Sequence, residues 1–86
     1  MSTAYFLINA RLNHESEIIE KAKSVLKEAN LSSYEVQGTF GIYDIVVKLS
    51  APNDDTLRKI VLEKLRKIEN IESAITMMVN EEQGYA

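Results

Sequence analysis

Residues 34–49, YEVQGTFGIYDIVVKL, contain two segments of high β propensity around a glycine-rich centre. Tyr34–Phe40 and Tyr43–Leu49 are rich in aromatic and β-branched residues, and each predicts a strand. Gly41 lies between them, and glycine is the residue that a tight turn tolerates best. Gly38, inside the first segment, allows a bulge. The stretch therefore predicts a β-hairpin in the middle of the chain.

Two amphipathic segments flank this hairpin. The first begins after Asn13, a residue that can cap a helix, and ends near Asn30. The second begins at residues 52–55, where Pro52 ends a strand and a short polar side chain can cap the next helix. Their apolar residues recur at helical spacing, which predicts two helices with one buried face each. These residues are Ile18, Ile19, Ala22, Val25, Leu26 and Ala29 in the first segment, and Leu57, Ile60, Val61, Leu65 and Ile68 in the second.

The two ends of the chain complete a symmetric order of elements. Ala4–Leu12 and Ile71–Val79 are rich in β-forming residues and predict the first and last strands. The order β-α-β-β-α-β then consists of two β-α-β halves, as in ferredoxin-like domains. Right-handed crossovers place four antiparallel strands in one sheet, with both helices on one face. The sequence therefore predicts an α+β fold in one domain, residues 1–80, followed by a polar tail at residues 81–86.

The composition excludes several classes of function. The chain has 86 residues, no Cys and one His, so it can form neither a disulfide nor a Cys or His metal cluster, and we expect no metal and no cofactor. Its formal net charge is -3, which argues against direct nucleic-acid binding. No apolar run approaches the roughly 20 residues that span a bilayer, and no signal peptide is visible. We therefore expect a cytoplasmic protein without membrane contact.

No residue pattern indicates a catalytic centre. His14 lies among polar residues at a helix start, where an exposed first-turn side chain is the simplest interpretation and a catalytic base is the alternative. Asp54 and Asp55 suit the first turn of the second helix, with metal binding as the alternative. A Ser–His pair would need a supporting context such as Gly-x-Ser-x-Gly, which the chain lacks. We therefore expect no catalytic residues and no enzymatic activity.

The sheet face that the helices leave open is predicted to be partly apolar. Alternation along the strands places Leu7, Val46, Ala74 and Met78 in its middle, within a polar border. Such a face suggests burial against the sheet of a second copy, in a dimeric α+β barrel-type assembly. The small core of so short a domain favours self-association, whereas a monomer with scattered surface apolar residues is the alternative. The first-strand residues expected to face the helices are Phe6, Ile8, Ala10 and Leu12.

The middle of the chain also resembles a known family. Residues 41–48, GIYDIVVK, are similar to the Gly-x-Tyr-Asp-hydrophobic signature of the effector-binding (RAM) domain of Lrp/AsnC regulators. Residues 62–68 and 71–76 resemble its second helix and final strand, and the likeness extends from Ala4 to Asn80. The resemblance implies a ferredoxin-like fold, dimers packed sheet against sheet, and further assembly of dimers into octamer-like rings. It also implies an amino acid or similar small-molecule effector held between dimers.

The resemblance further implies where that effector binds. Gly41, Tyr43 and Asp44 match the family's glycine–aspartate loop, and Thr76 matches a hydroxyl residue of its last strand. Asp44 would pair with an ammonium group, whereas a hairpin turn whose acid satisfies nearby amides is the alternative. The family often has a Thr-Arg-Thr run on the last strand, but this chain has Ala74-Ile75-Thr76, so one hydroxyl is missing.

The resemblance predicts a stand-alone module. Family regulators carry an N-terminal helix-turn-helix, but here the first predicted strand begins almost at Met1. We therefore expect either an amino-acid sensor or a partner that co-assembles with a full-length Lrp/AsnC regulator. A purely structural oligomerisation module without a ligand is a second hypothesis.

A small dimeric α+β barrel enzyme, of the cofactor-free monooxygenase or isomerase type, is a third hypothesis. Such an enzyme needs a polar catalytic group in a cavity between sheet and helices. The residues expected to face that space are apolar, which argues against it. They are Ile8, Ala10, Ile45 and Val47.

Overall fold

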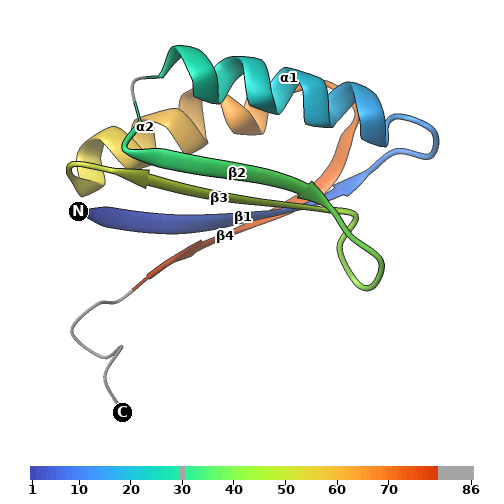
Figure 1. Cartoon of the computed structure of the whole chain (residues 1–86). Coiled ribbons are helices and arrows are strands. Elements are labelled where there is room, and N and C mark those ends of the chain that lie inside the picture. The colour runs from blue at the N-terminus through green and yellow to red at the C-terminus, as the bar shows by residue number, and fades with distance from the viewer. Residues whose placement is uncertain (30, 80–86) are drawn as a thin grey trace.

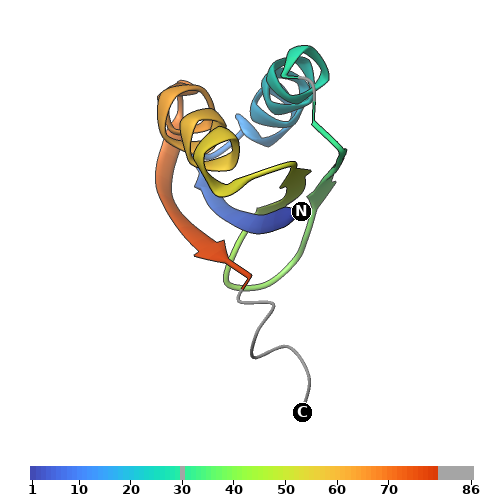
Figure 2. The same ribbon diagram turned by 90° about the vertical axis from the view of Figure 1, so that its left-hand side faces the viewer.

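The computed structural model describes residues 1–29 and 31–79. The elements are β1 (Ser2–Ala10), α1 (Glu15–Glu28), β2 (Ser33–Gly38), β3 (Ile45–Ala51), α2 (Asp54–Glu63), a short 3-10 helix η1 (Leu65–Lys67) and β4 (Ile71–Met78). The strands form one sheet in the order β2-β3-β1-β4, and each neighbouring pair is antiparallel. Both helices cover the same face of the sheet (Figures 1 and 2), so the ferredoxin-like prediction is confirmed. The polar tail at residues 81–86 lies outside the described residues.

The core lies between the sheet and the two helices. Alternate residues of β1 and β3 point toward the helices, and both helices turn their apolar faces onto the sheet. Full burial of one Leu, Ile or Phe side chain stabilises a fold by about 1.5–3 kcal/mol. The core residues are Ala4, Phe6, Ile8 and Ala10 of β1, Ile45, Val47, Leu49 and Ala51 of β3, Ile18, Ala22 and Leu26 of α1, and Leu57, Ile60, Val61 and Leu65 of α2 and η1.

The connection between β1 and α1 differs from the prediction. Because β1 ends at Ala10, Leu12 does not face the helices but is 82% exposed, so its predicted place in the core is wrong. The chain turns at Asn13, whose φ of 70° lies in the left-handed region that Asn tolerates. The helix begins at Glu15 with His14 in the cap position and no capping bond from a side chain. The cap predicted for Asn13 is therefore absent, since this residue forms the turn instead.

The start of α2 follows the prediction. The side-chain oxygen of Asn53 accepts a hydrogen bond from the backbone N–H of Thr56 at 2.9 Å, which is the geometry of a helix cap. The helix stop predicted at Asn30 lies outside the described residues. Among the residues that the structure describes, no helix has the length and apolar character needed to cross a membrane.

The register of β4 against β1 reverses the predicted faces of the last strand. The pairs are Ala4–Met78, Phe6–Thr76, Leu7–Ile75 and Ile8–Ala74. Directly opposite residues of an antiparallel pair point to the same face. Ala74, Thr76 and Met78 therefore lie on the helix side. Ile75 and Met77 take the open face in their place, so the prediction that Ala74 and Met78 lie there is wrong.

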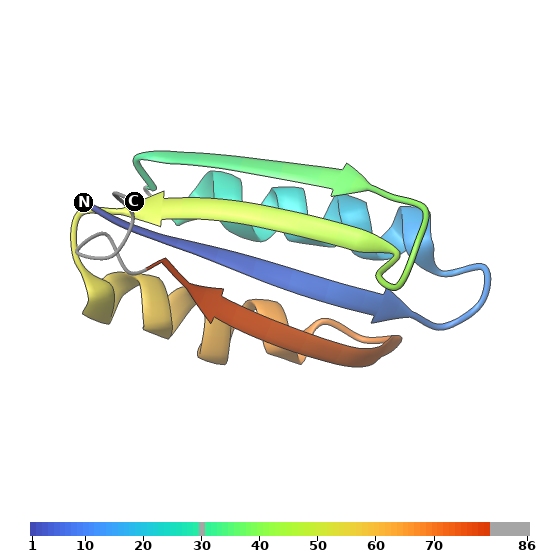
Figure 3. The same ribbon diagram turned by 90° about the horizontal axis from the view of Figure 1, so that it is seen from below.

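The faces of β1 and β3 are as predicted. Leu7 lies directly opposite Val46, and alternation along the strands places both on the face that carries no helix. Figure 3 shows the molecule from the side of this face. Gly38 pairs in register with Ile45, so the bulge that this glycine allows does not form. The register instead shifts at the end of β1, between Asn9 and Ala10, where this strand pairs with β4. Below, "open face" means this helix-free side of the sheet.

Candidate functional site

The loop between β2 and β3 is closed by its own hydrogen bonds. The backbone N–H of Thr39 donates to the carbonyl of Asp44 at 2.8 Å, and its hydroxyl donates to the carbonyl of Tyr43 at 2.6 Å. Gly41, at the tip, has a φ of +143°, which L side chains rarely adopt. The loop therefore has a defined shape, set by bonds across its base and by glycine at its tip.

Asp44 connects this loop to the end of β1. Its backbone N–H donates to the carbonyl of Ile8 at 2.9 Å, and its carboxylate oxygen Oδ2 accepts from the N–H of Ala10 at 2.9 Å. The carboxylate thus acts as the hydrogen-bond acceptor beyond the last backbone pair of β1 and β3. This contact fits the predicted alternative in which the acid satisfies a nearby amide. Among the described residues, the other carboxylate oxygen, Oδ1, has no hydrogen-bond partner in the structure.

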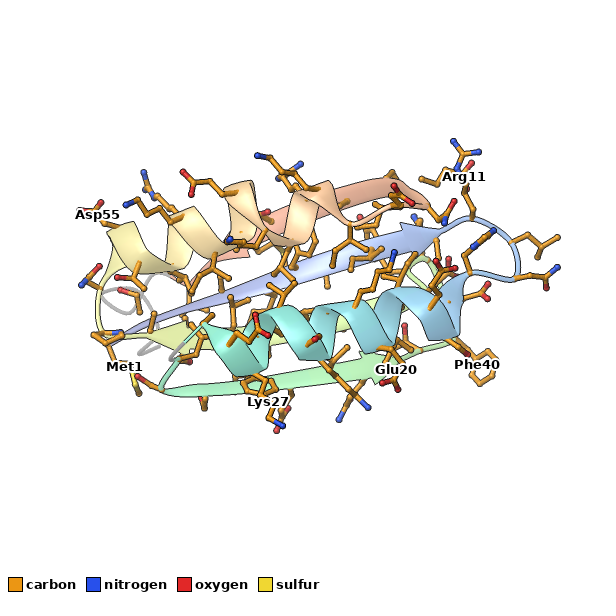
Figure 4. The ribbon with its side chains drawn as sticks, turned by 90° about the horizontal axis from the view of Figure 1, so that it is seen from above. Met1, Arg11, Glu20, Lys27, Phe40 and Asp55 are labelled. Carbon is orange, nitrogen blue, oxygen red and sulfur yellow. The ribbon has the colours of Figure 1, made fainter. Side chains whose placement is uncertain are left out.

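Large apolar side chains project from this end of the molecule. Phe40 and Ile42, on either side of Gly41, are 107% and 85% exposed, and Leu12 on the neighbouring β1–α1 loop is also exposed. Figure 4 shows Phe40 at the same end of the molecule as Arg11, opposite the end that carries Met1. We call Leu12, Phe40 and Ile42 the apolar loop end. Large exposed apolar side chains gathered at one end of a molecule often mark a contact with another molecule.

Thr76 has a partner that the sequence did not indicate. Its hydroxyl oxygen accepts a hydrogen bond from the Arg66 guanidinium at 3.2 Å. The same guanidinium lies over the ring of Phe6, with Cζ 5.7 Å from the ring centroid. The contact depends on the turn from α2 into η1, which brings position 66 beside β4. We found no sequence signal that singles out Arg66 from the other basic residues around it.

The two parts of the expected ligand site are far apart within one subunit. Asp44 contacts β1 at Ala10, whereas Thr76 lies opposite Phe6 on the far side of β1. Four residues of strand span about 13 Å, and the lateral step from β3 to β4 adds about 10 Å. One amino acid cannot reach both side chains in a single chain. A ligand that touches both would therefore have to lie between two subunits.

The open face has an apolar half and a polar half. Tyr5 and Leu7 of β1 lie opposite Met77 and Ile75 of β4, and the latter two are 49% and 47% exposed. The β2 side of the same face is polar and carries Glu35, Gln37 and Lys48, with Val46 at the boundary. The exposed apolar half is therefore centred on β1 and β4.

The space between sheet and helices contains no catalytic arrangement that the described residues reveal. It is filled by the apolar core; Ser50, a buried polar residue whose hydroxyl bonds that of Thr3 at 2.8 Å, alternates to the opposite face of the sheet. No group of three or more acidic, His or Cys side chains within the described ranges is placed to hold a metal ion. His14, in the cap position of α1, is paired with Glu17 of the exposed first turn at 2.9 Å.

Comparison with known proteins relates this arrangement to transcription regulators. The chain is 35% identical over 79 residues to an HTH-type transcriptional regulator of Pyrococcus furiosus, PF0250; the match covers 90% of this chain and 50% of the relative. FFRP-DM1 has 28% identity and a TM-score of 0.72, over 93% of this chain and 100% of that one. This chain has the RAM-type domain of the Lrp/AsnC family. The search with family models gave no match.

Other solved structures share the fold of this RAM-type domain at lower identity. E. coli AsnC is 21% identical with a TM-score of 0.72, over 91% of this chain and 50% of AsnC. The regulator NMB0573 of Neisseria meningitidis, solved as a complex with L-Met, is 14% identical with a TM-score of 0.65, over 95% of this chain and 51% of the regulator. The RAM-type domain thus spans about half the length of the regulators that it matches.

Proposed function

We propose that this RAM-type domain binds an amino acid or a related small molecule in the cytoplasm and changes its state of assembly when it does so. The observation that carries the proposal is the closed loop from Thr39 to Asp44. Its glycine tip lets a ligand approach the backbone, and Asp44 Oδ1 is free to accept a hydrogen bond from an ammonium group. The L-Met complex of the structural neighbour from Neisseria meningitidis supports an amino acid as the ligand class.

The proposed assembly begins with a twofold dimer, in which two open faces pack together. Leu7 and Val46 remain in the proposed interface, and Ile75 and Met77 replace the pair that lies on the helix side. Stable interfaces bury about 800 Å² on each partner, which is on the scale of one face of a four-stranded sheet. The apolar half of the open face supplies the central contact, and its polar half the rim.

Dimers would then join through their apolar loop ends into a higher oligomer, such as an octamer-like ring. This contact would cover Phe40 and Ile42, which are solvated in a lone subunit. It would also allow the loop of one subunit and Thr76 of another to meet one ligand, which the distances within one chain forbid. A ligand held there shifts assembly by the difference between its affinities for the joined and separate dimers.

A longer regulator is the proposed protein partner. The Pyrococcus furiosus regulator is about twice as long as the region that matches, so the matched region is one half of it. Two RAM-type domains can pair through the same open face whether they belong to identical or to related chains. Mixed dimers would change how many DNA-reading domains an assembly carries, without any contact between this domain and nucleic acid.

An oligomerisation module without a ligand is the second candidate. The observation that favours it is the bond between the Asp44 carboxylate and the N–H of Ala10, which gives this acid a structural use. Under this function the open face and the apolar loop end keep their roles. The amino-acid response alone is lost.

A melting experiment separates the two candidates. The protein is heated with each of the twenty L-amino acids at millimolar concentration, alongside Asp44→Asn and the exposed-acid control Asp54→Asn. We expect at least one amino acid to raise the melting temperature of the wild type and of the control by the same amount, and to raise that of Asp44→Asn by clearly less. If no amino acid raises the melting temperature of the wild type, the sensor function is wrong and the oligomerisation module without a ligand is retained.

A further inference from the structure

A hollow of about 220 Å³ lies on the polar half of the open face. Its lining residues are Tyr5, Glu35, Gln37, Val46 and Lys48. The strand pairing accounts for the grouping, because Lys48 of β3 lies opposite both Glu35 of β2 and Tyr5 of β1. All the lining side chains therefore come from strands and share one face of the sheet. The hollow is separate from the loop site, which lies beyond the start of β3.

The hollow holds one acid and one base that do not pair with each other. Glu35 and Lys48 are directly opposite across the β2–β3 pair, a position that normally favours an ion pair. Yet no contact within 4.0 Å joins them, and both ion pairs that the structure records among the described residues involve Glu17 of α1. The Lys48 ammonium instead lies 5.9 Å from the centroid of the Tyr5 ring. Lys48 is thus directed toward the β1 side, and the two charges are more than 4.0 Å apart.

We infer that this hollow is a second amino-acid site, in which Lys48 binds the carboxylate of the ligand and Glu35 binds its ammonium group. A zwitterion carries both charges on neighbouring atoms and would bridge the gap between the two side chains by charge-assisted hydrogen bonds. The volume is several times the roughly 30 Å³ that one water occupies, so a small amino acid fits. Gln37 adds an amide for hydrogen bonding, and Val46 gives an apolar wall for the ligand's side chain.

The hollow lies on the open face, so ligand binding in it is coupled to formation of the proposed dimer. The inference rests on the proposed function, since the ligand class and the dimer are the ones proposed there. Leu7, in the proposed interface, lies opposite Val46 of the hollow, so a second sheet would reduce the water around Lys48 and Glu35. Charges that lose water without a partner are costly, and a bound zwitterion provides a partner for each. Ligand binding and dimer formation therefore favour one another.

The test compares variants of the hollow with a variant of the loop. Lys48→Met and Glu35→Gln remove one charge each at nearly constant size, and Lys48→Arg keeps the charge. Lys67→Met, on exposed η1, controls for loss of a surface lysine. Calorimetric titration of wild type and variants with the amino acids of the panel gives affinity and stoichiometry. Circular dichroism checks that each variant is folded, as expected for exposed strand positions.

The inference predicts binding that the two neutral variants weaken at least about tenfold, while Lys48→Arg, Lys67→Met and Asp44→Asn retain it. Wild type would then bind two molecules per subunit if the loop site is also occupied. If Lys48→Met and Glu35→Gln bound amino acids as the wild type does, and Asp44→Asn did not bind them, the hollow would not be an amino-acid site. The proposed function would remain intact. If the wild type gave no titration signal with any amino acid, both the sensor function and the second amino-acid site would be rejected. The proposed dimer is tested separately, by measuring the mass of the protein in solution.

Discussion

Ala10 donates its backbone N–H to the carboxylate of Asp44 across a distance of 2.9 Å. This bond joins the end of β1 to the start of β3 at the point where regular strand pairing stops, since the last backbone pair is Ile8 with Ile45. It also fixes the acid of the Gly-x-Tyr-Asp segment against the sheet. One carboxylate oxygen of Asp44 thus makes a structural contact, and the other has no hydrogen-bond partner among the described residues.

Loss of this carboxylate should destabilise the fold. Asp44→Ala leaves the N–H of Ala10 without its acceptor, and an unsatisfied, partly buried amide costs about 1–3 kcal/mol. Asp44→Asn keeps an oxygen acceptor and should cost less. Urea unfolding of the three proteins measures both values. Equal stability of Asp44→Ala and wild type would show that water replaces the carboxylate without loss.

The cap of α2 gives a second stability prediction. Asn53→Ala removes the acceptor for the Thr56 N–H and should lower the free energy of unfolding by about 1 kcal/mol. Asn53→Ser, which can cap in the same way, serves as the matched control and should lie close to wild type. Thermal unfolding of the two variants is the measurement. Identical melting temperatures for Asn53→Ala and Asn53→Ser would show that the side-chain cap does not stabilise the helix.

The exposed pair in α1 predicts a titration shift. The hydrogen bond from His14 holds the pKa of the Glu17 carboxyl below its usual value, and the Lys21 ammonium lowers this pKa further, while desolvation opposes both effects. A depressed acid pKa favours the folded state above the unfolded pKa, and this contribution is lost as pH falls through the lowered folded pKa. NMR titration of the Glu17 side chain should show its pKa rise in His14→Ala. An unchanged Glu17 titration in that variant would rule out His14 as the cause.

Two neighbouring methionines test the face of β4. Met77 lies on the open face and Met78 on the helix side, and both are partly exposed. Met77→Lys should therefore break the proposed dimer, because it places a charge in the centre of the covered surface. Met78→Lys should leave the dimer intact. Sedimentation equilibrium reports the mass of each, and dissociation caused by Met78→Lys alone would reverse this assignment.

The apolar loop end predicts a separate effect on assembly. Phe40→Ser and Ile42→Ser alter side chains that contact water in the subunit, so stability should change by less than about 0.5 kcal/mol. Light scattering should show that the variants remain dimers but no longer form larger assemblies. If the ring persisted in the double variant, dimers would have to join through another surface.

The sequence was sufficient for the order of elements and for most of the core. Alternation along β1 and β3 and helical spacing in α1 and α2 are strong signals, because each element buries one face and exposes the other. In β4 both alternating sets contain apolar residues, Ala74 and Met78 on one side and Ile75 and Met77 on the other. The pattern therefore could not choose between the faces, and only the pairing with β1 does.

The site was predicted less completely than the fold. The sequence singled out Gly41 and Asp44, but not the bond from Ala10, since a contact between positions 10 and 44 follows from strand order and register. Thr76 and the loop were expected to contact one ligand held between dimers, and within one subunit the sheet places β1 between them. Arg66 and the separation of Glu35 from Lys48 depend on side-chain packing. Patterns of residue type along the chain carry no information on such contacts.

The proposed assembly and the proposed sensing both depend on burial of the open face against a second subunit. The mass of the unmodified protein in solution tests this burial most directly. Sedimentation equilibrium at micromolar concentration should give twice the mass of one chain or a multiple of that. A single-chain mass at this concentration, with or without amino acids, would contradict the account.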